Sequence, residues 1–194
     1  MKLKKFFLSA AVIISMVVFT NCGSEKKEVS NTSEEPITFK LALVDPENSN
    51  FAKGANKIAE EVEKATNGKI KIDVYAGGSL GGERDTIELA MGDNLDIATA
   101  ANSVLTNFIP EMGILDQPYL WSNSDEAHAA IDGAVGDLVK REALKHGLHV
   151  IGFMESGYRN TFSTKPIKTM ADFKGVTIRT MENKYHQAAF ESFG

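Results

Sequence analysis

The sequence is poor in cysteine, in proline and in long apolar runs, and each shortage excludes a class of protein. A single cysteine, Cys22, among 194 residues excludes a disulfide framework and a cysteine-rich zinc site. Five prolines and 16 glycines are ordinary usage, which excludes a collagen-like chain. With 43% hydrophobic and 24% charged residues, the composition is neither that of a coiled coil nor that of a fully disordered chain. The length then predicts a globular protein of one domain or slightly more.

Basic residues are also in the minority. The chain has 21 Lys and Arg against 26 Asp and Glu, which gives a formal net charge of −5. A general nucleic-acid binder needs a basic face, so we expect no nucleic-acid partner.

The longest apolar run, residues 6–19, follows a cluster of lysines and is too short to span a bilayer comfortably. This pattern predicts a signal peptide over residues 1–21. Cys22 comes directly after Phe19-Thr20-Asn21, and the four residues resemble a bacterial lipobox. We therefore expect lipidation of the Cys22 sulfur and a membrane-anchored lipoprotein in the periplasm or at the cell surface. A plain secretory signal with an incidental cysteine, or an uncleaved anchor, is the alternative.

Residues 22–36 are polar and contain too few apolar side chains to bury a core, so they predict a disordered tether. Removal of residues 1–21, which hold three lysines and no acid, lowers the formal charge from −5 to −8.

The following residues alternate strand and helix patterns. Residues 38–44 and 95–100 predict strands, and residues 69–75 alternate apolar and polar side chains, as in a half-buried strand. Apolar residues at helical spacing from Phe51 to Ala65 predict a helix that Ser49 or Asn50 can cap and that ends at Asn67-Gly68. A second helix is expected over residues 84–91. This order predicts an α/β layer with a mainly parallel sheet.

The second half is expected to continue in the same way. Its predicted elements are a helical turn at 103–108, an edge or crossing strand at 114–121, a helix that begins after Asn123 and is broken by Gly133 and Gly136 before 138–146, strands at 148–154, 158–163 and 176–179, a turn at 170–173, and a helix at 184–193.

Residues that could carry catalysis are scarce. There is no Gly-x-Ser-x-Gly elbow, and the one cysteine lies beside the leader. The glycine-rich turn 77–82 lacks the Lys-Ser/Thr ending of a P-loop, which favours a tight turn with positive φ. His146 and His149 could form a metal pair, but exposed surface histidines are the favoured interpretation. We therefore predict no enzyme, no cofactor and no metal.

Two arginines lie at the ends of predicted strands. Arg159 follows Gly157-Tyr158, and Arg179 ends residues 176–179. Ligands of α/β sheets bind near strand ends, and a guanidinium can grip a carboxylate with two hydrogen bonds. For either arginine taken singly, a surface salt bridge is the favoured interpretation, and the spacing of the two does not by itself decide against it.

Several blocks, in order, resemble the DctP-type solute-binding proteins of TRAP transporters. These blocks are 67–72 (NGKIKI), 78–84 (GSLGGER), 108–111 (FIPE), 115–120 (LDQPYL), 157–160 (GYRN), 165–167 (KPI) and 172–179 (DFKGVTIR). The resemblance extends from about Thr38 to the last residue.

The resemblance implies two α/β lobes of a periplasmic-binding-protein-like fold, joined by hinge strands and a long helix, that close over a small organic anion. It further implies delivery of that anion to a TRAP membrane permease of two subunits. On this basis we expect part of lobe one at residues 37–122 and a truncated part of lobe two at 123–194, so the chain resembles an N-terminal fragment.

The family also suggests ligand-binding residues. Arg179 matches the arginine that clamps the ligand carboxylate, and Arg159 matches a supporting arginine. Glu83 matches an acidic residue that accepts hydrogen bonds from sugar hydroxyls. The remaining candidates occupy loop or polar positions of the family, and they are Asn50, Phe51, Asn102 and Glu182.

The acidic candidates favour a sugar acid, such as a hexuronate, over a C4-dicarboxylate or a keto acid, because a carboxylate repels a second ligand carboxylate. Two other functions stay open from the residues alone, namely an exported enzyme acting on sugar acids and a structural surface lipoprotein.

Overall fold

The computed structural model describes residues 35–194. The predicted signal peptide, Cys22 and nearly all of the tether lie outside these residues. Their processing and lipidation therefore stay predictions. Among the described residues, no helix is both long and apolar enough to cross a membrane.

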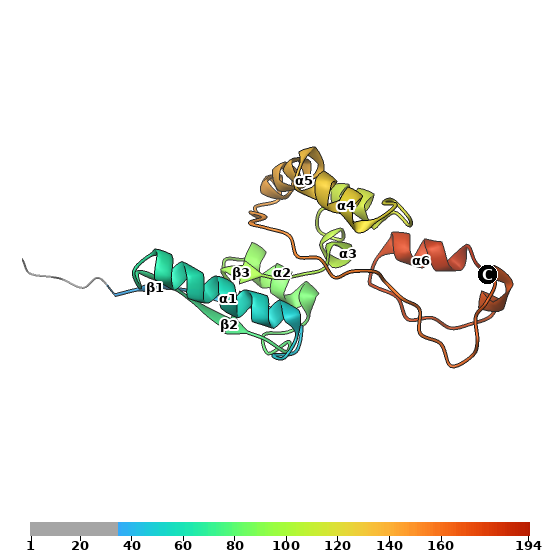
Figure 1. Ribbon diagram of the computed structural model, residues 1–194, viewed down its shortest axis with the longest axis horizontal. Coiled ribbons are helices and arrows are strands. Elements are labelled where there is room, and N and C mark those ends of the chain that lie inside the picture. The colour runs from blue at the N-terminus through green and yellow to red at the C-terminus, as the bar shows by residue number, and fades with distance from the viewer. Residues whose placement is uncertain (1–34) are drawn as a thin grey trace, which may run out of the picture. The chain divides into compact units, whose positions relative to one another are not determined.

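A three-stranded parallel sheet organises the first part of the described chain (Figure 1). The central strand β1 (Ile37–Ala42) pairs with β2 (Ile70–Tyr75) on one side and with β3 (Ile97–Ala98) on the other. In the register, Leu41 lies opposite Val74 of β2 and Ile97 of β3. The parallel α/β layer predicted from the alternating pattern is confirmed.

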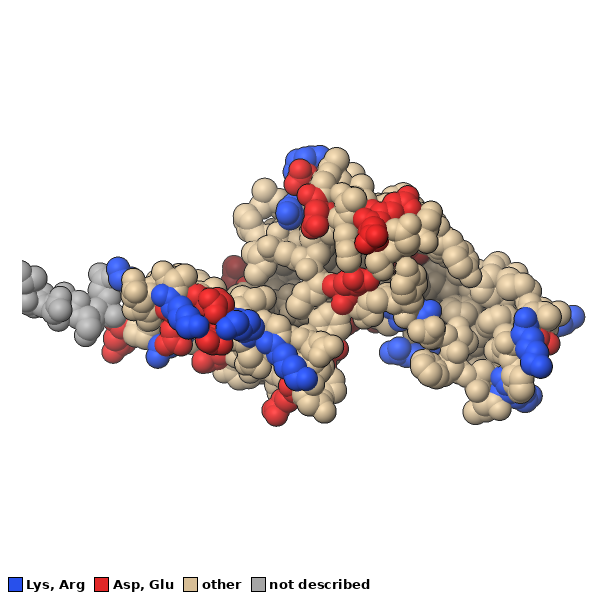
Figure 2. All heavy atoms as spheres, viewed as in Figure 1, with Lys and Arg blue, Asp and Glu red and all other residues tan. Residues whose placement is uncertain are grey.

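Helix α1 (Asn50–Ala65) packs its apolar face against this sheet. Ser49 caps it by accepting a hydrogen bond from the Ala52 amide, at 3.0 Å. The buried core contains Leu41 and Leu43 of the strand layer together with Ala52 and Ala55 of the helix. The opposite face carries lysines and glutamates in i,i+3 and i,i+4 pairs (Figure 2). The spacing of apolar residues in this segment predicted a helix with one buried face and one solvent-exposed face.

The glycine-rich turn before α2 (Glu83–Met91) has the left-handed backbone that its composition predicted. Gly77 and Gly78 have φ of 69° and 68°. Asp85 accepts a hydrogen bond from the Gly82 amide at 2.8 Å and so closes the first turn of the helix.

The next part is helical, in contrast to one prediction. It contains α3 (Asn102–Leu105), the 3-10 helix η1 (Pro110–Asp116), α4 (Ser124–Ile131) and α5 (Ala134–Lys145). The strand predicted at 114–121 is wrong: its first three residues belong to η1, which Pro110 can start because proline needs no amide hydrogen there. Met112 and Ile109 form a second core with Val139 and Ala143 of α5.

The helix predicted after Asn123 is confirmed, since the Asn123 side chain accepts the Glu126 amide as its N-cap. Gly133 separates α4 from α5 as expected, but Gly136 lies inside α5 instead of breaking it. A Cβ at Gly136 would overlap the carbonyl of Ile131, so the glycine permits a tight approach between the two helices.

The last described part contains the 3-10 helix η2 (Met170–Phe173) and α6 (Lys184–Glu191). The strands predicted at 148–154, 158–163 and 176–179 are absent from residues 35–194. A strand exists only with a hydrogen-bonded neighbour, and apolar periodicity does not supply one. Ile151 and Phe162 are accordingly 77% and 95% exposed. The division into lobes at residue 122 stays a prediction.

Candidate functional site

Four of the predicted site residues follow the carboxyl ends of the three parallel strands. Asn50 and Phe51 open α1 after β1, Glu83 opens α2 after β2, and Asn102 opens α3 after β3. The carboxyl ends of parallel strands meet at one edge of a sheet, and this is the edge where ligands of α/β proteins bind. The sheet topology thus brings these four residues to one edge.

Glu83 and Asn102 are each held by a hydrogen bond to the backbone of another residue. The Glu83 Oε1 accepts a hydrogen bond from the amide of Ala101 at 3.1 Å, one residue before Asn102. Asn102 donates from Nδ2 to the carbonyl of Met112 at 3.1 Å. Phe51 packs against the sheet core and Asn50 is exposed. Glu83 and Asn102 are therefore fixed by backbone contacts, and Phe51 by packing.

The two predicted arginines lie outside regular structure, and both are exposed. Within residues 35–194, neither Arg159 nor Arg179 has an acidic partner at salt-bridge distance. A surface salt bridge for either arginine would therefore need an acidic partner that the described chain does not provide. Both guanidiniums keep their hydrogen-bond donors available for an anion.

Glu182 is engaged by a residue that the sequence did not single out. The guanidinium of Arg84 binds the Glu182 carboxylate through Nε, at 3.1 Å to Oε1 and 3.3 Å to Oε2, and through Nη2. This arginine lowers the pKa of the Glu182 carboxyl group. Arg84 also lies over the ring of Phe108, with its Cζ 5.3 Å from the ring centroid.

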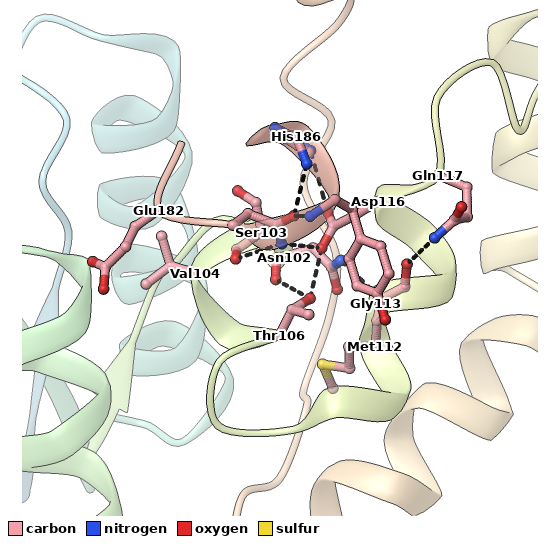
Figure 3. Close-up of polar contacts among 12 residues, drawn as sticks. Asn102, Ser103, Val104, Thr106, Met112, Gly113, Asp116, Gln117, Glu182 and His186 are labelled. Atoms are coloured by element: carbon pink, nitrogen blue, oxygen red, sulfur yellow. Dashed lines mark hydrogen bonds and ion pairs between the residues drawn. The ribbon is translucent and has the colours of Figure 1, made fainter. Parts of the chain in front are cut away.

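A buried polar cluster also escaped the sequence prediction (Figure 3). The Asp116 Oδ2 accepts hydrogen bonds from Thr106 Oγ1 at 2.6 Å and from Asn183 Nδ2 at 2.8 Å. Asn183 is 2% exposed, and its Nδ2 also donates to the carbonyl of Ser103 at 2.9 Å. The available signals were an asparagine just before a predicted helix and an aspartate inside a family block, and neither indicates a shared partner.

His186 borders this cluster, with Nε2 3.7 Å from the Asp116 Oδ1. Burial lowers the pKa of His186, the Asp116 charge opposes this, and the positive charge of Arg159 adds a smaller lowering. Burial thus favours the neutral form of the His186 imidazole. Arg159 lies near enough to influence it electrostatically.

No group of three His, Cys, Asp or Glu in the described part of the chain is arranged to hold a metal ion. His146 faces Glu111, with Nε2 3.8 Å from Oε2, and His149 is exposed. Surface histidines therefore stay the favoured interpretation of these two residues.

Comparisons with known proteins bear on the family of the chain. The model of the family described as bacterial extracellular solute-binding protein, family 7 (DctP), matches residues 41–194. The 2,3-diketo-L-gulonate-binding periplasmic protein YiaO of Escherichia coli K12 is 33% identical over 141 residues, which are 72% of this chain and 43% of that protein.

Solved structures agree with the sequence match. A TRAP periplasmic solute-binding protein from Polaromonas sp. JS666, bound to D-erythronate, matches with a TM-score of 0.78 and 33% sequence identity. The match covers 81% of this chain and 52% of that chain. One from Sulfurospirillum deleyianum, with bound succinate, has a TM-score of 0.78 and 28% identity and covers 83% and 52%.

The chain spans about half the length of the relatives that it matches. The structural neighbours have the two-lobe fold that the resemblance implied, and the described residues share their mixed α/β architecture with a parallel sheet. Because the family model covers 154 of the 194 residues and the fold agrees, the chain belongs to the DctP family of bacterial extracellular solute-binding proteins.

Proposed function

We propose that the protein captures a small organic acid outside the cytoplasm and delivers it to the membrane permease of a TRAP transporter. The observation that supports this most directly is the pair of exposed arginines, Arg179 and Arg159, without acidic partners in the described chain. A carboxylate that leaves water loses its hydration, and a guanidinium fork replaces it with two charge-assisted hydrogen bonds.

In this proposal Arg179 clamps the ligand carboxylate, and Arg159 supplies a second positive charge. Glu83, Asn102, Asn50 and Phe51 supply the facing surface at the carboxyl edge of the sheet. Since Glu83 and Asn102 are already fixed by backbone contacts, little side-chain entropy is lost when they meet a ligand.

A sugar acid is the favoured ligand class. Glu83 uses Oε1 for the Ala101 amide, and its other carboxylate oxygen can accept a hydrogen bond from a ligand hydroxyl. The same negative charge disfavours a second carboxylate on the ligand. The relatives that bind 2,3-diketo-L-gulonate and D-erythronate support this class, and the succinate-bound relative supports the dicarboxylate alternative.

The test uses the complete protein and a panel of D-galacturonate, D-erythronate, succinate and pyruvate. We expect a thermal shift with at least one sugar acid, followed by a measurable affinity in calorimetry. Arg179→Ala should weaken the binding of that acid by about 100-fold or more, since it removes a charged pair from a desolvated carboxylate.

Arg141→Ala, on α5, is the matched control because it removes an exposed arginine that is not among the proposed ligand-binding residues. Its affinity should stay within about twofold of the parent. Unchanged affinity in Arg179→Ala would refute the clamp, and no binding of any panel acid would refute the proposed function.

A further inference from the structure

The carboxylate of Glu182 is paired with an arginine, although its side chain is 60% exposed. Both of its oxygens lie within hydrogen-bond distance of the Arg84 guanidinium, across 98 positions of sequence. Its backbone carbonyl accepts a second contact, from Asn107 Nδ2 at 2.7 Å. The side chain of Glu182 is thus held by α2, and its backbone by the turn that follows α3.

Arg84 is itself well placed for this contact. It lies in the first turn of α2, next to Glu83, and its guanidinium is held over the Phe108 ring. Its other acidic neighbour, Glu88, is 3.8 Å away, one turn further along α2. The planar fork of an arginine can hold a carboxylate in one orientation, which a flexible lysine cannot do.

The residues around Glu182 connect this contact to the proposed ligand clamp. Arg179 lies three residues before Glu182, and the buried Asn183 follows it directly. Residues 180–183 therefore run from the clamp to a fixed point on α3 and η1. The contact that holds Glu182 against α2 therefore also limits the positions that Arg179 can take.

We propose that Arg84 and Glu182 form a positioning pair, which holds residues 179–183 against α2 so that Arg179 faces the sheet edge that carries Glu83 and Asn102. Glu182 then acts through Arg84. An acidic cleft residue, in contrast, would contact the ligand directly. This inference rests on the proposed function for its ligand and adds Arg84 to the residues on which binding depends.

A double-mutant cycle tests the pair, with D-galacturonate or D-erythronate as the probe, whichever binds the parent. The variants are Arg84→Gln, Glu182→Gln and the double variant in the complete protein. Charge effects alone would make Glu182→Gln bind an anion more tightly and Arg84→Gln more weakly. Positioning predicts that both single variants bind about threefold to tenfold more weakly, and that the double variant is no weaker than the weaker single variant.

Glu88→Gln is the matched control, because it removes an acid that also neighbours Arg84 without touching residues 179–183. It should bind within about twofold of the parent. Unchanged or tighter binding by Glu182→Gln overturns the proposal. So does weaker binding by Glu182→Gln together with parental binding by Arg84→Gln, since Glu182 would then contact the ligand itself.

Absence of binding in the parent protein would refute the proposed function. The contact between Arg84 and Glu182 would then be tested by proteolysis without ligand. The contact between Arg84 and Glu182 is supported if trypsin cleaves after Arg179 faster in both single variants than in the parent, and if the double variant is cleaved no faster than the single variants. Cleavage at the parental rate in both overturns it.

Discussion

Asn183 uses every hydrogen-bonding atom of its amide side chain. Nδ2 donates to Asp116 and to the Ser103 carbonyl, while Oδ1 accepts the amides of Tyr185 and His186 and so caps α6. A buried polar group is tolerated when all its partners are present. The capping role was accessible from the sequence, because asparagine is a common residue before a helix. Partners 67 and 80 positions away were not.

His186 gives a pH prediction at the same scale. Its folded-state pKa lies below the ordinary value of 6.5, mainly because of burial, so the unfolded chain binds more protons at mildly acidic pH. The free energy of unfolding should therefore fall as the pH drops through 6.5 and below. The facing charges of Asp116 and Arg159 have opposite effects on this histidine and do not remove the shift.

The measurement is urea denaturation of the parent and of His186→Gln between pH 7.5 and 5.5. The variant should lose less stability over this range than the parent does. His149→Gln is the control, because His149 is exposed on the surface. Parallel stability curves for the parent and His186→Gln would contradict the assignment.

At the scale of elements, the contact of α6 with η1 depends on one glycine. Gly113 is buried, and a Cβ built there would lie 2.8 Å from Cζ of the Tyr185 ring. The Tyr185 ring of α6 therefore packs directly on the backbone of η1. Only glycine permits this close approach, because it has no Cβ. This close approach brings the start of α6 to the Asp116 cluster.

We predict that Gly113→Ala lowers the free energy of unfolding by about 1–3 kcal/mol, since the tyrosine ring must move away from a close-packed contact. Thermal or urea unfolding of the purified variant measures this. Gly152→Ala is the control, because its added Cβ meets no atom within 4 Å and should change stability by less than about 0.5 kcal/mol. Equal losses in the two variants would rule out the packing explanation.

The elements of the first half were predictable because each one carries its own signal. The period of α1, its Ser49 cap and the alternation in β2 are all local. The strands predicted between residues 148 and 179 failed because a strand also needs a neighbour. Apolar side chains such as Ile151 and Phe162 fit a strand pattern, yet no backbone within residues 35–194 pairs with them.

At the scale of the whole molecule, order is unevenly distributed. Residues 148–169 form no helix or ladder and expose most of their side chains, whereas α1 and the sheet share a buried core. Local opening is easiest where buried contacts and backbone hydrogen bonds are few.

Among residues 35–194, limited trypsin digestion should therefore cut first after Arg159 and Lys168. The bond after Lys165 resists trypsin, because Pro166 follows it. Lysines of α1 such as Lys57 and Lys64 are equally exposed, but their backbone is held in helical hydrogen bonds and should resist longer. Mass spectrometry of the early fragments identifies the sites. Cleavage in α1 at the same rate would contradict this prediction.

The sequence alone determined the α/β order, the caps and turns of the first half, and the family, because these depend on residues near one another in the chain. It also led to the proposal that Arg159 and Arg179 bind an anion, which stays a prediction. Only the tertiary structure decided that Arg84 holds Glu182, that Asp116 meets Asn183, and that Tyr185 rests on Gly113. Such contacts join residues 67 to 98 positions apart, and they form only when packing brings distant elements together, which no local pattern encodes.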